Sequence, residues 1–154
     1  MALDKVLADI DSDLDGSLAR LFDLLRIKSI STDPAFRDDC ARAAFWLRGQ
    51  LSGMGFEASV RETAGHPMVV AHAKAKRADA PHVLFYGHYD VQPVDPLSLW
   101  HSDPFAPHLV EEEGDKRIVA RGAADDKGQL MTFVEACRAY MANGGLPCHV
   151  TILF

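Results

Sequence analysis

Several features are scarce or missing in this sequence of 154 residues, and each absence argues against a class of protein. A membrane-spanning helix needs about 18 consecutive apolar residues, and every apolar run in this sequence is much shorter. The N-terminus, MALDKVLADIDSDLDG, carries charge every few residues and holds no apolar segment of a secretory signal. Cysteine is rare, and Cys40, Cys137 and Cys148 form no C-x-x-C pair, which argues against a disulfide framework and a cysteine zinc site. We therefore expect a cytoplasmic protein with reduced thiols.

Positive charge is also in short supply, with 16 basic against 22 acidic residues and a net charge of −6. This balance argues against nucleic acid or a membrane as the main partner. No glycine-rich phosphate loop follows the first predicted strand, which argues against a nucleotide-binding domain. What remains, 48% hydrophobic and 25% charged residues, is the composition of an ordinary globular domain.

Apolar residues recur at helical spacing in three segments. The first runs from Leu3 to Leu25 and predicts one amphipathic helix of about six turns, weakened at Gly16. The pair Asp33-Pro34 predicts the cap and first turn of a second helix, which continues to Met54 and ends at Gly55. A third helix is predicted over residues 127–143, and Gly144-Gly145 ends it.

The other segments read as strands and turns. Strands are predicted over residues 56–63, 68–75, 82–87 and 148–154, and a hairpin over 108–113 and 116–120. Four prolines make residues 91–107 a long loop. Residues 82–87 are almost wholly apolar, which predicts a strand covered on both faces. The final strand is expected to expose an apolar edge. Helices before and between buried strands indicate the α/β class, a sheet with helices on its faces.

Two short motifs lie at the ends of hydrophobic segments, YGHYDVQPV at residues 86–94 and ARGAADDKG at residues 120–128. His88 and Asp90 directly follow a predicted strand, and sites in open α/β sheets gather outside such carboxyl ends. An imidazole is a common metal ligand, and its second ring nitrogen usually donates to a carboxylate such as Asp90.

The second motif contains two adjacent acids. Asp126 precedes the third helix and has Gln129 three residues later, the spacing of a capping box. This leaves Asp125 free to face His88, while Gly122 and Gly128 allow close approach of the backbone. Alone, each motif is more often structural than metal-binding, so spacing leaves both interpretations open.

The motifs GHYDVQP, WHSDPF (Trp100 to Phe105) and ARGAADDKGQ resemble those of the dinuclear zinc aminoacylase and carboxypeptidase family. This family includes carnosinase-type dipeptidases, acetylornithine deacetylase and succinyl-diaminopimelate desuccinylase. The resemblance implies a three-layer α/β/α sheet, a zinc exopeptidase-like catalytic domain of which residues 1–154 form the N-terminal portion. Ala120 stands where many relatives have glycine, a mild departure that leaves the acids unaffected.

The resemblance also implies roles for individual residues. His88 corresponds to a ligand of one zinc ion, Asp125 to the carboxylate that bridges two zinc ions, and Asp90 to the catalytic-site acid that holds the histidine. The Asp125–Asp126 peptide is expected to be cis. The general base and the remaining ligands are expected beyond Phe154, so the 154-residue chain alone is expected to be inactive.

The implied activity is zinc-dependent cleavage of a peptide bond in dipeptides or short peptides, with Mn²⁺ or Co²⁺ as substitutes for Zn²⁺. One alternative is an amidohydrolase of the same family that acts on N-acyl amino acids. Another is a non-catalytic truncated binding or interaction module, although intact His88, Asp90 and Asp125 count against a decayed site. A homodimer of the full-length protein is left open.

Overall fold

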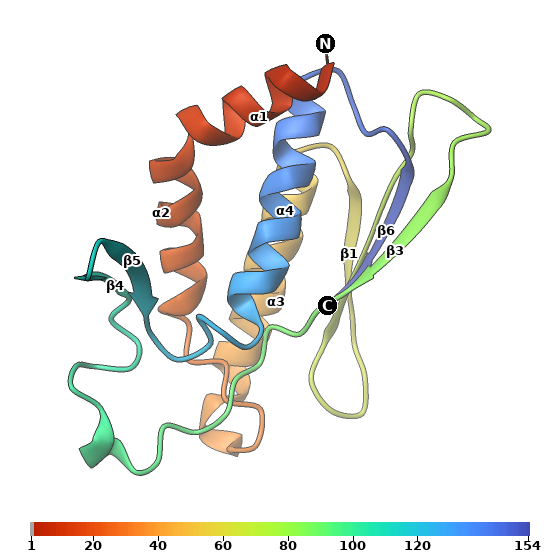
Figure 1. Ribbon diagram of the computed structural model, residues 1–154. Coiled ribbons are helices and arrows are strands. Elements are labelled where there is room, and N and C mark those ends of the chain that lie inside the picture. The colour runs from red at the N-terminus through yellow and green to blue at the C-terminus, as the bar shows by residue number, and fades with distance from the viewer. Residues whose placement is uncertain (1) are drawn as a thin grey trace.

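The computed structural model describes residues 2–154 and places helices against a mixed sheet (Figure 1). The helices are α1 (Ala2–Ser12), α2 (Leu14–Leu25), α3 (Arg37–Gly53) and α4 (Lys127–Ala142), with short 3₁₀ turns η1 (Pro34–Phe36) and η2 (Leu97–Leu99). The main sheet contains β1 (Glu57–Arg61), β2 (Met68–Ala73), β3 (His82–Tyr86) and β6 (His149–Leu153). Strands β4 (His108–Glu112) and β5 (Asp115–Val119) form the predicted hairpin, away from this sheet.

The strand order in the main sheet is β1-β2-β6-β3. β2 is antiparallel to both β1 and β6, whereas β6 is parallel to β3. The chain passes from β3 to β6 through α4, which is the crossover connection that parallel strands require. Because β6 lies between two strands, the prediction that residues 148–154 form an exposed edge is wrong. Within residues 2–154 the edge strands are β1 and β3.

The core lies between the sheet and the helices. Alternate residues of the central strands, among them Val69, Ala71, Val150 and Ile152, are buried against this layer because strand side chains alternate between faces. α3 and α4 supply the matching apolar side chains, including Leu47, Leu51, Leu130 and Val134. Each such fully buried side chain contributes about 1.5–3 kcal/mol relative to exposure.

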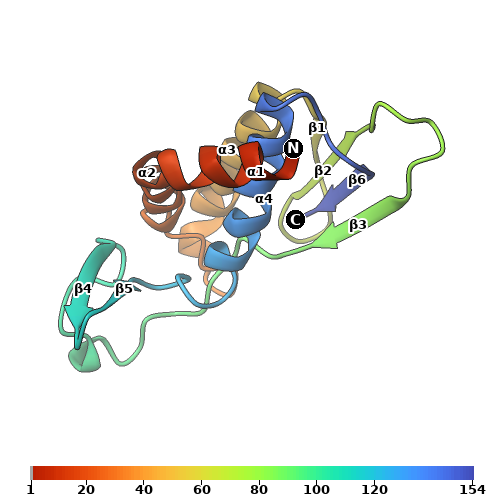
Figure 2. The ribbon, with the colours of Figure 1, turned by 45° about the horizontal axis from the view of Figure 1, so that its top comes forward.

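Strand β3 is packed on one face only. Phe85 stacks on Phe133 of α4, with ring centroids 3.9 Å apart and planes at 2°. On the opposite face, Leu84 and Tyr86 are 63% and 71% exposed. The prediction that both faces of this strand are covered is therefore wrong within residues 2–154. Figures 1 and 2 show the helices together on one side of the sheet, so the α/β class is confirmed while the described residues form two of the three expected layers.

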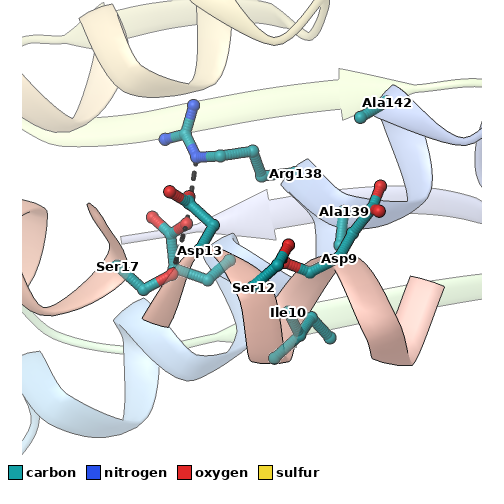
Figure 3. Close-up of a pocket in the computed structure, with 9 residues that line it drawn as sticks. Asp9, Ile10, Ser12, Asp13, Ser17, Arg138, Ala139 and Ala142 are labelled. Carbon is teal, nitrogen blue, oxygen red and sulfur yellow. Dashed lines mark hydrogen bonds and ion pairs between the residues drawn. The ribbon is translucent and has the colours of Figure 1, made fainter. Parts of the chain in front are cut away.

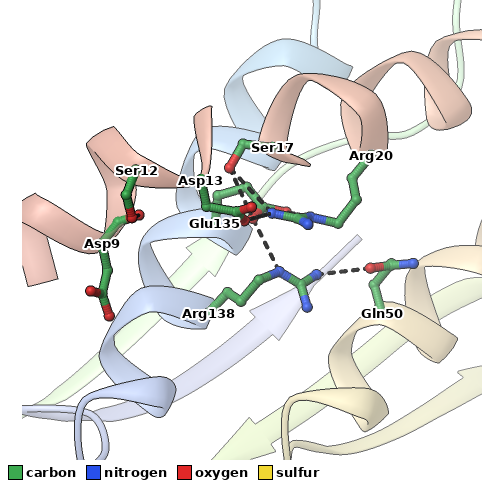
Figure 4. A network of polar contacts seen from close by, with 8 residues as sticks. All are labelled: Asp9, Ser12, Asp13, Ser17, Arg20, Gln50, Glu135 and Arg138. Atoms are coloured by element: carbon green, nitrogen blue, oxygen red, sulfur yellow. Dashed lines mark hydrogen bonds and ion pairs between the residues drawn. The ribbon is translucent and has the colours of Figure 1, made fainter. Parts of the chain in front are cut away.

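The predicted first helix is two helices, and the break falls at Asp13 rather than at Gly16. Asp13 has φ −107° and ψ 22°, which is outside the helical region, and α1 and α2 each contact α4. A network of charged side chains joins the helices (Figure 4). Arg20 donates to both carboxylate oxygens of Glu135 (2.8 and 2.6 Å) and to Asp13 (2.6 Å), and Arg138 donates to Glu135 and to Gln50. Because α1 and α2 both pack on α4, apolar residues recur at helical spacing on both sides of Asp13. Helical periodicity alone therefore did not reveal the break.

The boundaries of the second predicted helix follow the sequence signals. Asp33 accepts a hydrogen bond from the backbone nitrogen of Ala35 at 2.9 Å, and Pro34 begins the following turn, as predicted. Gly55 follows α3 with φ +101°, a conformation that glycine adopts readily. None of the helices among residues 2–154 has the length and apolar character needed to cross a membrane.

Candidate metal centre

The two sequence motifs meet at one end of the sheet. Residues 87–91 follow β3, and residues 120–126 lead from β5 into the N-terminus of α4. The backbone nitrogen of Gly87 donates to the carbonyl of Leu153, so the exit of β3 lies beside the end of β6. These parallel strands therefore place their carboxyl ends at the same edge, where sites of α/β sheets gather.

The His88 imidazole lies between two carboxylates. Its Nδ1 is 3.1 Å from Oδ1 of Asp90, and its Nε2 is 3.0 Å from Oδ1 of Asp125. The carbonyl of Asp90 is a further acceptor for Nδ1, at 3.2 Å. The expected convergence of His88 with Asp125, and the expected bond from His88 to Asp90, are both present.

The two carboxylates change the acidity of the histidine. Partial burial lowers the pKa of His88, but hydrogen bonds to Asp90 and Asp125 and their negative charges together outweigh burial. The net result is a pKa above the ordinary histidine value. The proton on Nε2 occupies the lone pair that a metal ion would need, so proton and metal compete at this atom.

Asp126 joins the two motifs instead of capping α4. Its Oδ2 accepts a hydrogen bond from the backbone nitrogen of His88 at 3.1 Å, and it makes no side-chain capping bond. Gln129 donates to the carbonyl of Ala124. The predicted capping box is therefore wrong, because both side chains have other partners. The Asp125–Asp126 peptide is cis, as expected.

The glycines of the second motif have the roles that the sequence suggested. Gly122 has φ +86°, a backbone conformation that side-chain-bearing residues rarely adopt. A Cβ atom on Gly128 would lie against the carbonyl oxygen of Ala123, so only glycine allows this approach. The turn that presents Asp125 therefore depends on both positions.

The remaining acids and histidines of the sequence do not join this cluster. Asp103 accepts a bond from the backbone of Phe105 within its own loop, and Glu112 pairs with Arg117 across the hairpin. Glu111 and Glu113 are exposed at that hairpin. Within residues 2–154 no group of three or more His, Cys, Asp or Glu side chains has a metal-binding arrangement.

Three residues around the motifs were not identified from the sequence. The hydroxyl of Ser31 donates to Oδ2 of Asp90 at 2.5 Å, and His66 donates to the carbonyl of Ser31. Both line a hollow of about 520 Å³ that reaches His88 and Asp90. Lys127 is fully buried directly after Asp126 and binds the end of α2. A serine between two helices and a lysine in a helix give no local sign of such contacts.

A second hollow, of about 210 Å³, lies between α1 and α4 (Figure 3). Its acids are already paired, since Asp9 accepts from Asn143 and Glu135 accepts from Arg20 and Arg138. Carboxylates that neutralise arginines at a helix junction stabilise packing, so this hollow is a structural feature.

The donor set at His88 fits part of a zinc site. Imidazole nitrogen and carboxylate oxygen are both zinc donors, and His88 and Asp125 present them from accessible side chains that are 38% and 80% exposed. Asp90 occupies the other ring nitrogen, which is the usual partner arrangement of a ligating histidine. A catalytic zinc ion has about three protein ligands, so His88 and Asp125 alone do not make a complete ligand set.

Comparison with known proteins gives consistent results. The sequence pattern of peptidase family M20/M25/M40 matches residues 84–154. A cysteinylglycine-S-conjugate dipeptidase of Corynebacterium striatum is 32% identical over 149 residues, which cover 94% of this chain and 32% of the relative. A succinyl-diaminopimelate desuccinylase of Cupriavidus necator is 33% identical over 86% of this chain and 34% of the relative.

The fold has the same relatives. The crystal structure of human carnosine dipeptidase 1 superposes with a TM-score of 0.87 at 27% identity, over 99% of this chain and 34% of that protein. The chain thus spans about a third of the length of the relatives it matches. The resemblance that the motifs indicated is confirmed: the chain is related to the peptidases of family M20/M25/M40.

Proposed function

We propose that this chain supplies part of the metal site of a hydrolase that cleaves the peptide bond of dipeptides or short peptides. The observation that carries the proposal is the imidazole of His88 between Asp90 and Asp125. The motifs that hold these residues lie within the segment that matches the peptidase family. The dipeptidases among the relatives support a peptide as the substrate.

In this proposal His88 and Asp125 hold the metal, and Asp90 orients the histidine. His88 would hold one zinc ion with its imidazole, and the carboxylate of Asp125 would be shared between two zinc ions. When bound, Zn²⁺, or Mn²⁺ or Co²⁺ in its place, would supply a water of lowered pKa and polarise the scissile carbonyl. Asp90 accepts a hydrogen bond from Nδ1–H and keeps the proton of the neutral imidazole on Nδ1, so the lone pair of Nε2 stays available for the ion. Asp126 bonds the backbone of His88 and keeps the two ligand-bearing segments together.

The rest of the site is expected in residues outside this chain. A general base must accept a proton from the water and deliver it to the leaving amine, and His88, Asp90 and Asp125 are occupied by other tasks. The 154-residue chain alone is therefore expected to bind zinc weakly and to hydrolyse no dipeptide above background. The intact protein is expected to bind zinc tightly and to hydrolyse dipeptides.

The test uses the intact protein and measures zinc content and dipeptide hydrolysis on the same samples. His88→Ala and Asp125→Ala should lose metal and activity together. Asp90→Ala should lower metal affinity about ten- to a hundredfold, as the loss of a ligand's hydrogen-bond partner does. Glu113→Ala, at the exposed hairpin, serves as the matched control. A His88→Ala protein that keeps full zinc content and activity would contradict the proposal.

A second candidate is an amidohydrolase that removes the acyl group from N-acyl amino acids. The observation in its favour is the similarity to a succinyl-diaminopimelate desuccinylase. Both reactions cleave an amide bond and use the same metal chemistry, so His88, Asp90 and Asp125 serve either substrate. A panel of dipeptides and N-acyl amino acids separates the two, and metal content without any hydrolysis would favour a non-catalytic binding module.

A further inference from the structure

The segment between α2 and η1 contacts both halves of the proposed site. We call residues Ile27–Ser31 the connector. The carbonyl of Ile27 accepts a hydrogen bond from Nζ of Lys127 at 2.7 Å, and Leu24 at the end of α2 supplies a second carbonyl at 3.1 Å. Lys127 has no exposed surface and follows Asp125 by two residues. The connector therefore binds the segment that carries one metal ligand.

The same connector binds the segment that carries the other ligand. Ser29 is fully buried, and its hydroxyl donates to the carbonyl of Tyr89 at 2.6 Å. Its own carbonyl accepts from the backbone nitrogen of Val91 at 2.9 Å. Ile30 and Val91 form an isolated parallel bridge. These contacts enclose Asp90, which lies between Tyr89 and Val91.

Ser31 contacts the carboxylate of Asp90 itself. Its hydroxyl donates to Oδ2 at 2.5 Å, while the other oxygen, Oδ1, faces Nδ1 of His88 at 3.1 Å. A carboxylate with a single partner can rotate about its terminal bond, whereas one with a partner on each oxygen is fixed. His66 donates to the carbonyl of Ser31 at 2.8 Å and holds the serine in turn. The orientation of the imidazole thus depends on Ser31 through Asp90.

We propose that the connector Ile27–Ser31 positions both ligand-bearing segments, and that Ser31 is the positioning residue that sets the His88 imidazole for metal binding. This inference rests on the proposed function, because it assigns Ser31 a task at that same metal site. Ser31 acts through Asp90 and is not itself a ligand. Removal of its hydroxyl should leave the ligands in place and loosen their orientation.

The experiment compares Ser31→Ala and Ser31→Thr in the intact protein with Ser12→Ala as the matched control. Ser12 is an exposed serine whose hydroxyl bonds the backbone of Asp9 on α1. Zinc affinity is measured by competition with a chelator, and kcat and KM are measured separately. NMR follows the resonance of the Nδ1–H proton of His88. A fixed hydrogen bond to Asp90 slows the exchange of this proton with water and keeps its resonance visible. Ser31→Ala should weaken zinc binding about tenfold and broaden this resonance. It should also lower kcat by a larger factor than it changes KM.

Ser31→Thr keeps a hydroxyl and should retain the zinc affinity of the parent, as should Ser12→Ala. If the parent binds zinc and hydrolyses substrate while Ser31→Ala binds zinc equally well, the inference is wrong and the proposed function stands. A parent without zinc overturns the proposed function and this inference with it. If Ser31→Ala does not fold, Ser31→Thr decides, since a tenfold loss despite the retained hydroxyl contradicts the inference.

Discussion

Replacement of Gly128 by alanine tests the close approach on which the Asp125 turn depends. The added Cβ would lie well under 3.0 Å from the carbonyl oxygen of Ala123, a distance that real Cβ atoms essentially never show. The obstacle is backbone, so either the turn or the start of α4 must move. Such overpacking costs about 1–3 kcal/mol and occasionally more, and a backbone obstacle places this case at the upper end. Alanine recovers about 0.5–1 kcal/mol over glycine in a helix.

The net expectation for Gly128→Ala is a loss of about 2 kcal/mol in the free energy of unfolding, which lowers Tm by roughly 4–8 °C. Gly49→Ala in α3 is the matched control, because no atom lies within 4 Å of its added Cβ. The control should gain about 0.5–1 kcal/mol and raise Tm slightly. Thermal and urea unfolding of both variants measure the difference, and zinc affinity reports displacement of Asp125. A Gly128→Ala protein as stable as the control would refute the reasoning.

Three further outcomes are expected. Burial lowers the pKa of Lys127 from 10.5 to about 7, so between these values the unfolded chain binds more protons than the folded one and the free energy of unfolding rises with pH. Lys127→Met should remove that rise in urea titrations at pH 7 to 10. Burial raises the pKa of Cys40 to about 11 and of Cys137 to about 12. A thiol reagent should therefore react in the native protein first with Cys148, the one cysteine among residues 2–154 that is only half-buried. Arg20→Met leaves Glu135 without its main partner and should cost about 1–3 kcal/mol in unfolding free energy.

The pair of motifs could be found from the sequence because both signals are local. His88 and Asp90 follow a strand directly, and strand ends of parallel pairs meet at one edge. Asp125 could be separated from Asp126 only by assigning Asp126 a different task. The predicted task, a capping box with Gln129, was wrong, because Asp126 instead accepts a hydrogen bond from the backbone of His88. These two residues are 38 positions apart, and a capping rule considers only neighbours.

Other features depend on partners that periodicity does not describe. The apolar pattern of β3 is the same whether one face or two are covered, so burial of Leu84 could not be decided from composition. The break at Asp13 gives no proline or glycine signal at that position. Ser31 and Lys127 contribute through hydrogen bonds to distant segments, and serine and lysine are ordinary residues in turns and helices.

The position of β6 between β2 and β3 has a consequence for the order of folding. β2 and β3 are separated by a short stretch of chain, yet they share no ladder and each pairs with β6, which follows some 60 residues after β3. During synthesis, β3 therefore has no strand to pair with until residues 149–153 have emerged. Contacts of such long sequence separation form slowly, and an unpaired apolar strand is prone to intermolecular pairing while it waits. The helices and the β1–β2 hairpin, which need only local contacts, can form before β6 joins β2 to β3.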